Sequence, residues 1–253
     1  EMNSFANTFQ NNATQYVTPA PYSGTVYPYL KSEICPPANP AVGLPECHSL
    51  VASDAITKVN DGAGSMFYYG HGSTITTDHY FGYVSDNARG YVNNGKYTSL
   101  FIYGCDVNNV FRGRNEIAFT GVGKSAMPFT VDWLLTPNRG AITVVGNSWE
   151  GYESILNAML KKEYERLFVS DRNRKSIGEI MKESINAAMS SIPGYNTRAL
   201  AIGVDNSDHN YNFTQANAQQ TLLLGDPSIV LLQVTDPLPV EWVSVTGKLL
   251  EDR

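Results

Sequence analysis

The stretch Met66-Phe-Tyr-Tyr-Gly-His-Gly-Ser73 is a short apolar run that breaks at a glycine. The same pattern occurs twice more: Leu100-Phe-Ile-Tyr103 breaks at Gly104-Cys-Asp106, and Ala141-Ile-Thr-Val-Val145 breaks at Gly146-Asn-Ser-Trp149. Short, near-continuous hydrophobic runs that end at glycine are typical of strands buried on both faces of a parallel sheet. The three runs therefore predict three parallel strands.

Helical patterns alternate with these runs. Residues 51–59 carry apolar side chains on one helical face up to a stop at Asn60-Asp-Gly62, and residues 152–168 keep an apolar stripe along their length. Ser176-Ile-Gly-Glu179 is a capping-box signature that predicts the start of a further helix. The alternation predicts an α/β fold, a three-layer α/β/α sandwich with helices on both faces of a mostly parallel central sheet.

The composition describes an ordered globular chain and excludes two classes of partner. Of the 253 residues, 42% are hydrophobic and only 17% are charged, the opposite of the balance in disordered chains. The formal net charge of -6 argues against a general nucleic-acid surface, because phosphate binding needs clustered Lys and Arg. No stretch approaches the roughly 20 apolar residues that span a bilayer. We therefore expect neither nucleic-acid binding nor a membrane span.

Changes in composition divide the chain into three parts. Residues 1–48 are polar and lack sustained periodicity, which predicts a loop-rich N-terminal segment; one interpretation is the remnant of a larger subdomain. Residues 49–235 carry the alternating strand–helix pattern and are predicted to form the main α/β domain. The change of character at Asp236-Pro-Leu-Pro239 predicts that residues 236–253 are a linker and the start of a following β domain.

The three cysteines fall into two groups. Cys35 and Cys47 bracket a proline-rich loop and are either a disulfide, in an oxidising compartment, or two unrelated loop thiols. Cys105 stands alone after an apolar run, so a chemical role for its thiol is to be tested before a structural one is assumed.

His71 and Cys105 occupy matched positions, because each directly follows the glycine that ends an apolar run. Catalytic groups gather beyond the carboxyl ends of the strands in an open parallel sheet. An imidazole there takes the proton of a thiol and makes the sulfur a nucleophile, and the N–H groups of Gly72 and Cys105 are candidate donors to an oxyanion. The alternative is a buried histidine and a small core cysteine, but their occurrence at two matched sites favours catalysis.

Other ionisable clusters predict no catalytic metal. His48, His79 and His209 have no partners at zinc-like spacing. Asp205 and Asp208 lie in an Asn-rich loop, which is either a structural calcium site or a solvated loop. Chemistry between a thiol and an imidazole requires no cofactor, so we expect none.

Several sequence blocks resemble one known family. Asn60-Asp-Gly-Ala-Gly-Ser-Met-Phe-Tyr-Tyr-Gly-His-Gly-Ser73 is similar to the histidine block of the gingipain cysteine peptidases, which share a clan with caspases and legumain. Trp133-Leu-Leu-Thr-Pro-Asn-Arg-Gly-Ala-Ile-Thr-Val-Val-Gly146 resembles their strand after the nucleophile. Ser176-Ile-Gly-Glu-Ile180 and Leu224-Gly-Asp-Pro-Ser228 resemble their later blocks, in the right order.

The resemblance implies a caspase-like fold and cysteine endopeptidase activity on protein or peptide substrates. It implies that Cys105 is the nucleophile, that His71 is its proton-transfer partner and that Gly72 belongs to the oxyanion hole. Gingipains also carry an upstream acidic residue that orients the histidine. It has no match in residues 1–48, so the third catalytic residue stays unassigned.

The resemblance also concerns substrate binding and export. It implies that Trp149, preceded by Asn147 and Ser148, walls the primary specificity pocket; the alternative is an aromatic residue that opens the next helix. Leu238-Pro-Val-Glu-Trp-Val-Ser-Val-Thr-Gly-Lys-Leu-Leu250 resembles the segment that opens the C-terminal region of type IX secretion cargo proteins in Bacteroidota. That resemblance implies export machinery as a partner, a secreted or cell-surface location, and a native chain that continues past Arg253. An ordinary edge strand is the alternative.

Two other functions use the same residues. One is a cell-surface binding or structural module on a catalytically silent peptidase fold, although retention of both His71 and Cys105 argues against it. The other is a sortase-like transpeptidase, which shares the first chemical step with a hydrolase and passes the acyl group to an amine.

Overall fold

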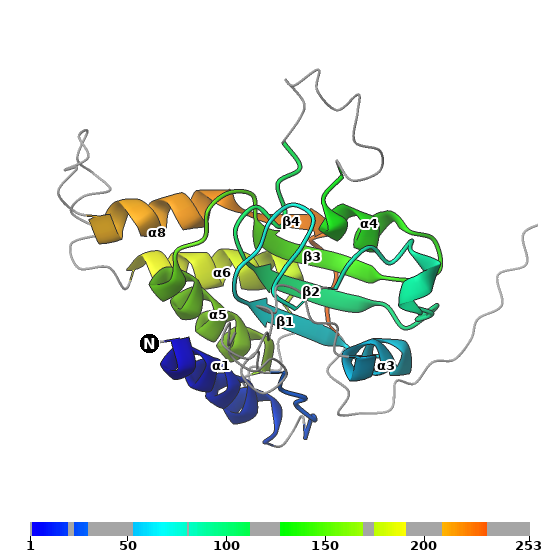
Figure 1. Ribbon diagram of the computed structural model, residues 1–253. Helices are drawn as coiled ribbons and strands as arrows, with labels where there is room; N and C mark the ends of the chain where they lie inside the picture. The colour runs from blue at the N-terminus through cyan, green and yellow to red at the C-terminus, as the bar shows by residue number, and fades with distance from the viewer. Residues whose placement is uncertain are drawn as a thin grey trace, which may run out of the picture.

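The computed structural model describes residues 2–19, 23–29, 53–79, 81–111, 127–168, 175–190 and 209–231. The elements of these residues are, in chain order, α1 (Met2–Val17), α3 (Ser53–Asp61), β1 (Ser65–Tyr69), the 3-10 turn η2 (Asn87–Arg89), β2 (Thr98–Tyr103), α4 (Phe129–Leu135), β3 (Ala141–Asn147), α5 (Glu153–Phe168), α6 (Ile177–Ser190), α8 (His209–Gln220) and β4 (Thr221–Gly225) (Figure 1). The predictions that lie outside the described residues concern Cys35, Cys47, His48, Asp205, Asp208 and residues 236–253.

The four described strands form one sheet in the order β1-β2-β3-β4 (Figure 1). β2 pairs in parallel with both β1 and β3, whereas β4 pairs antiparallel with β3. Every residue of β2 is buried, which explains why the run from Leu100 to Tyr103 within it is apolar without a break. The prediction of three parallel strands is confirmed.

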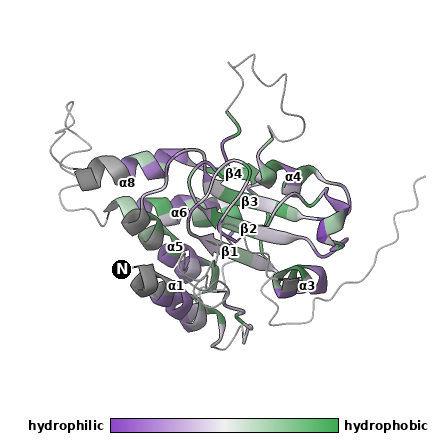
Figure 2. Cartoon of the chain, viewed as in Figure 1, coloured by the Kyte–Doolittle hydropathy of each residue, from purple (hydrophilic) through white to green (hydrophobic). Residues whose placement is uncertain are grey.

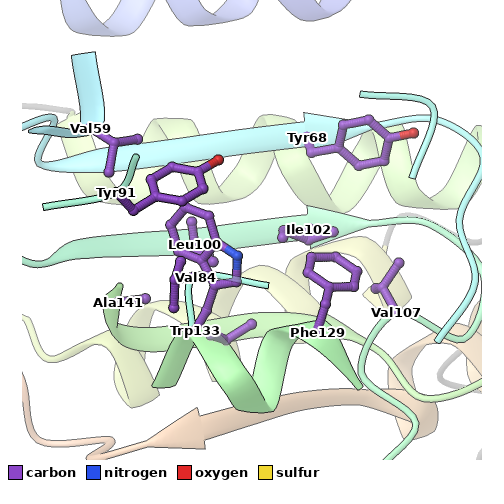
Figure 3. Close-up of a cluster of buried hydrophobic side chains, with 11 residues drawn as sticks. Val59, Tyr68, Val84, Tyr91, Leu100, Ile102, Val107, Phe129, Trp133 and Ala141 are labelled. Atoms are coloured by element: carbon purple, nitrogen blue, oxygen red, sulfur yellow. The ribbon is translucent and has the colours of Figure 1, made fainter. Parts of the chain in front are cut away.

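Successive residues of β2 point into two different hydrophobic clusters, because side chains alternate along a strand. Leu100 and Ile102 pack with Trp133 of α4 on one face of the sheet (Figure 3). Phe101 and Tyr103 pack on the other face, in a cluster that includes side chains of α1, α5 and α6. The mostly parallel sheet therefore has helices on both faces, and the predicted three-layer sandwich is confirmed.

Two of the helix-end signals in the sequence work as predicted. α3 ends at Asp61, and Gly62 follows with a φ of 104°, a left-handed conformation that glycine adopts without steric cost. At the start of α6, the Ser176 N–H donates to the Glu179 carboxylate at 2.8 Å and the Glu179 N–H donates to the Ser176 hydroxyl at 3.3 Å. These two reciprocal bonds form a capping box.

The prediction for the N-terminal segment was wrong in part, because residues 2–17 form helix α1 rather than loops. The helix carries many hydrophilic residues (Figure 2), and Asn and Thr have modest helix propensity, so the local signal is weak. Packing against α5 stabilises it instead. Ala13 lies in the same cluster as α5 side chains, and the Tyr16 hydroxyl donates to Glu165 at 3.1 Å.

Candidate active site

The segments that carry His71 and Cys105 leave the sheet side by side. Tyr69 and Tyr103, the last residues of β1 and β2, are paired in the parallel ladder. The Gly70 N–H also donates to the Tyr103 carbonyl at 3.2 Å, so pairing continues one residue beyond β1. We call residues 70–79 the histidine loop and residues 104–111 the cysteine loop. Both begin at the carboxyl edge of the sheet, where the spacing of the apolar runs predicts them.

Two glycines allow the two loops to touch. A Cβ atom added to Gly72 would lie 2.5 Å from Cγ1 of Val107 and 3.1 Å from the Cys105 carbonyl oxygen. A Cβ atom added to Gly104 would lie 3.1 Å from the Cα of Gly72. Any side chain at Gly72 would therefore force the loops apart, since such close contacts cost more than a packed interior tolerates. The backbones of His71 and Cys105 flank this contact.

The thiol of Cys105 is partly exposed and unbridged, and His71 is exposed. The backbone N–H of Gly151, which lies between β3 and α5, donates to Sγ of Cys105 at 3.4 Å. A donor at that position stabilises negative charge on sulfur. The sequence did not predict the role of Gly151, because the bond joins a main-chain group to a residue 46 positions away. Every residue type except proline carries a main-chain N–H, so the sequence holds no signal for such a bond.

Hydrogen bonds from a buried tyrosine shape the histidine loop. The Tyr68 hydroxyl donates to the His71 carbonyl and accepts from the Asp78 N–H at 3.0 Å. Burial, together with the negative charge of Asp78, raises the pKa of Tyr68 well above its ordinary value, so the hydroxyl remains a donor at neutral pH. Gly72 and Thr77 form a β-bridge across the same loop. The backbone of His71 is thus held on both sides.

The cysteine loop turns sharply after its first two residues. Asp106 has a φ of 58°, in the left-handed region that Asp tolerates better than most residues. Its N–H donates to the Trp149 carbonyl at 3.0 Å, and its carboxylate accepts from the side chain of Asn109 at 3.1 Å. The loop that carries Cys105 is therefore tied to the segment that follows β3.

The three residues predicted to bind substrate have different environments. Trp149 is 59% exposed. Ser148 is buried, and both its N–H and its hydroxyl donate to the Gln220 carbonyl, at 2.8 and 2.9 Å. Asn147 is fully buried, and its side-chain oxygen accepts from the Thr221 hydroxyl at 3.3 Å. Trp149 alone presents its side chain to solvent, whereas Asn147 and Ser148 anchor the segment after β3 to α8 and β4.

No acidic side chain is hydrogen-bonded to the His71 imidazole within the part of the chain that the structure describes, so the third catalytic residue stays unassigned.

The described residues also contain no cluster of three or more His, Cys, Asp or Glu side chains suited to a metal ion. His79, one of the histidines for which the sequence shows no metal partner, bonds through Nε2 to the Tyr29 carbonyl at 3.0 Å.

A family model matches residues 3–232 of the chain, and that model describes peptidase family C25. The chain belongs to peptidase family C25. The match confirms the resemblance to gingipains and extends it upstream to the residues of α1. No curated protein matches the sequence.

Solved structures agree with membership of family C25 at the level of the fold. The Arg-specific cysteine proteinase gingipain R superposes with a TM-score of 0.61 and 15% identity, covering 93% of this chain and 44% of its own. The complex of the pro- and mature domains of RgpB from Porphyromonas gingivalis gives 0.60 and 14%, covering 91% and 44%. A third solved protease gives 0.59 and 15%, covering 92% and 46%. The chain therefore spans less than half the length of these solved chains.

None of the helices in the described residues of this C25 chain has the length and apolar content to cross a membrane.

Proposed function

We propose that this member of peptidase family C25 is a cysteine endopeptidase that uses Cys105 as nucleophile and His71 as proton-transfer partner. The observation that carries the proposal is the backbone contact between Gly72 and Gly104 at the carboxyl edge of the sheet, which brings the two loops together. An exposed imidazole and an accessible thiol on adjoining loops are the groups that acyl transfer through sulfur requires.

The first half of the reaction transfers an acyl group to sulfur. His71 takes the thiol proton, and the Cys105 thiolate attacks the scissile carbonyl carbon, so a C–S bond forms and the carbonyl electrons move to oxygen. When the tetrahedral intermediate collapses, the C–N bond breaks and the imidazolium of His71 returns the proton to the leaving amine. The Gly151 N–H supports the thiolate before attack.

The second half is hydrolysis of the thioester. His71 removes a proton from water, the hydroxide attacks the acyl carbon, and the thiolate of Cys105 leaves with the electrons of the C–S bond. The N–H groups of Gly72 and Cys105 donate to no other group within the described residues. Both are thus free to hold the oxyanion in each half.

We assign the protein or peptide substrate to the surface beside Trp149, whose exposed ring lies next to the cysteine loop through the bond from Asp106. Asn147 and Ser148 contribute by holding that segment in place. We further propose a secreted or cell-surface location. Its support is the family of the chain and the resemblance of residues 238–250 to cargo of type IX secretion.

The test is covalent labelling with thiol-reactive peptidyl probes that vary in the side chain before the reactive group. We expect rapid labelling of Cys105 that depends on the probe side chain and is lost in His71→Ala. Cys105→Ala is expected to remove all peptide hydrolysis while leaving the fold intact. Slow labelling that is indifferent to both the probe and His71 would instead favour a silent binding module, and ligation of an added amine would indicate transpeptidation.

A further inference from the structure

Helix α4 begins between the two catalytic loops. Its first residue, Phe129, donates its backbone N–H to the Thr74 carbonyl of the histidine loop at 3.1 Å. The next residue, Thr130, donates its side-chain hydroxyl to the Val107 carbonyl of the cysteine loop at 2.8 Å. Two consecutive residues of one helix therefore each bind one of the two loops.

These contacts are shielded from water. Phe129, Thr130 and Val107 are all 0% exposed, and Thr74 is 5% exposed. Phe129 and Val107 belong to the hydrophobic cluster beneath the loops (Figure 3). A buried hydroxyl-to-carbonyl bond is directional, and its loss leaves a carbonyl without a partner. The Thr130 hydroxyl thus restricts where the Val107 carbonyl lies.

The position of Val107 in turn determines how the loops meet. Cγ1 of Val107 is the atom that a Cβ atom on Gly72 would approach to 2.5 Å, so Val107 abuts the histidine loop directly. A shift of the Val107 backbone therefore moves Cys105, two residues earlier, relative to His71.

α4 is itself well anchored. The indole N–H of Trp133 donates to the Gly82 carbonyl at 2.8 Å, and the Asp132 carboxylate accepts from the Ser85 N–H at 3.0 Å. Trp133 is 0% exposed and Asp132 is 4% exposed. These bonds fix the position of α4, and α4 in turn holds the two loops.

We infer that Thr130 is a positioning residue for the catalytic pair: its hydroxyl, acting through the Val107 carbonyl, sets the separation of the Cys105 thiol from the His71 imidazole. The inference rests on the proposed roles of these two residues. Proton transfer needs hydrogen-bond reach between the two groups, and displacement by about 1 Å lowers rates by up to about a hundredfold.

The test compares Thr130→Val, which keeps the shape and removes the hydroxyl, with Thr130→Ser, which keeps the hydroxyl and removes a methyl group. We expect kcat on a peptide substrate to fall at least tenfold in the valine variant, with KM changed less than about twofold. The serine variant is expected to stay within about threefold of the parent, because the bond to Val107 is retained.

A second readout needs no peptide substrate. The alkylation rate of Cys105 by iodoacetamide near neutral pH is measured with and without His71→Ala in each background. We expect His71 to accelerate alkylation in the parent and in Thr130→Ser, and the acceleration to fall at least tenfold in Thr130→Val. In the parent, the ratio of the alkylation rates with and without His71 tests whether His71 and Cys105 act as a pair. In Thr130→Val, the same ratio tests whether α4 positions them. Failure of the proposed function and failure of this inference are therefore distinguishable.

Thr136→Val is the control for loss of a threonine hydroxyl at the opposite end of the same helix, where the partly buried Thr136 donates to the Asp132 carbonyl at 2.7 Å and to the Asp132 carboxylate at 3.2 Å. We expect it to leave both readouts unchanged. Equal effects of Thr136→Val and Thr130→Val would overturn the inference, as would parent-like rates in Thr130→Val. A Thr130→Val chain that fails to fold while Thr130→Ser folds would also overturn it, since the bond would then maintain the whole fold.

Discussion

Gly72 lies where the histidine and cysteine loops meet, and its lack of a side chain has a direct chemical consequence. The nearest atoms to an added Cβ belong to Val107 and to the backbone of Cys105 and Gly104. A backbone neighbour yields less readily than the end of a flexible side chain. The lack of a side chain at Gly72 thus allows the close approach of two chain segments, in addition to the role proposed for its N–H.

We predict that Gly72→Ala lowers kcat/KM by at least about a hundredfold, because separating the loops removes the geometry for proton transfer. Gly64→Ala is the control, since a Cβ atom at Gly64 has no neighbour within 4 Å. Peptide hydrolysis and a thermal melt are measured for both. Full activity in a folded Gly72→Ala would show that the loops do not need this contact.

Glu163 is a second residue with a definite physical expectation. It is 0% exposed and accepts a hydrogen bond from the Tyr103 hydroxyl. Its other carboxyl oxygen has no partner among the described residues. Burial raises the pKa of Glu163 to about 8, against the opposing effect of the bond from Tyr103. The carboxyl is thus mostly protonated in the folded chain at neutral pH and ionised in the unfolded chain.

The sign of the resulting pH dependence follows from the raised folded-state pKa. The contribution of Glu163 to stability is fully present below its unfolded value of 4.5 and is lost as pH rises through about 8. The loss amounts to roughly 1.4 kcal/mol per pH unit. We predict that the free energy of unfolding of the parent, relative to Glu163→Gln, falls over this interval in urea titrations at several pH values.

Glu165 on the same helix provides the opposite case. Its partial burial favours the neutral form, but bonds from Lys162 and Tyr16 outweigh that effect and lower its pKa. Relative to Glu165→Gln, the parent is therefore expected to lose stability as pH falls. A parent curve parallel to that of Glu163→Gln from pH 5 to 8 would contradict the prediction for Glu163.

At the scale of elements, the ends of the helices are set by short local signals. α6 begins with reciprocal bonds between Ser176 and Glu179. The same end of the helix is tied to the turn after β4, because the Gly178 N–H donates to the Pro227 carbonyl at 2.9 Å. A local capping signal and a tertiary contact thus begin the helix at the same place.

We predict that Ser176→Ala destabilises the protein by about 1 kcal/mol, the usual cost of losing an N-terminal capping side chain. Ser190→Ala, at the other end of α6 where the side chain is exposed, is expected to change stability by less than about 0.5 kcal/mol. The free energy of unfolding is measured in urea. Equal values for the two variants would mean that the bond to Pro227 alone starts the helix.

At the scale of the whole molecule, β2 is the central structural element. It pairs with strands on both sides and contributes to a hydrophobic cluster on each face of the sheet. The proposed nucleophile, Cys105, follows the end of this strand after a single residue, Gly104. A fully buried strand therefore positions the proposed nucleophile.

We predict that the backbone amides of β2 exchange hydrogen more slowly than those of β1, which has a partner on one side only among the described strands. Amides that open only on global unfolding are the slowest to exchange. Hydrogen exchange followed by mass spectrometry compares residues 98–103 with residues 65–69. Faster exchange in β2 would contradict this order.

The sequence alone determined the elements whose signals are local. Three apolar runs were sufficient to locate β1, β2 and β3, and the capping box was sufficient for the start of α6. The expected break at Gly146 was wrong, because pairing with β4 continues β3 through Gly146 to Asn147. The matched positions of His71 and Cys105 were visible because strands of a parallel sheet all end at the same edge. The family blocks around them led to the same conclusion as the family match.

Only the tertiary structure decided the rest. The sequence of α1 favours a helix only weakly, and packing against α5 stabilises the helix. No pattern in residues 2–17 therefore predicted it. The bonds from Thr130 to Val107 and from Gly151 to Cys105 join positions 23 and 46 apart, and each involves a main-chain group that every residue type carries. Such contacts form only when the fold brings distant segments together. They therefore depend on tertiary packing rather than on which residues are neighbours along the sequence.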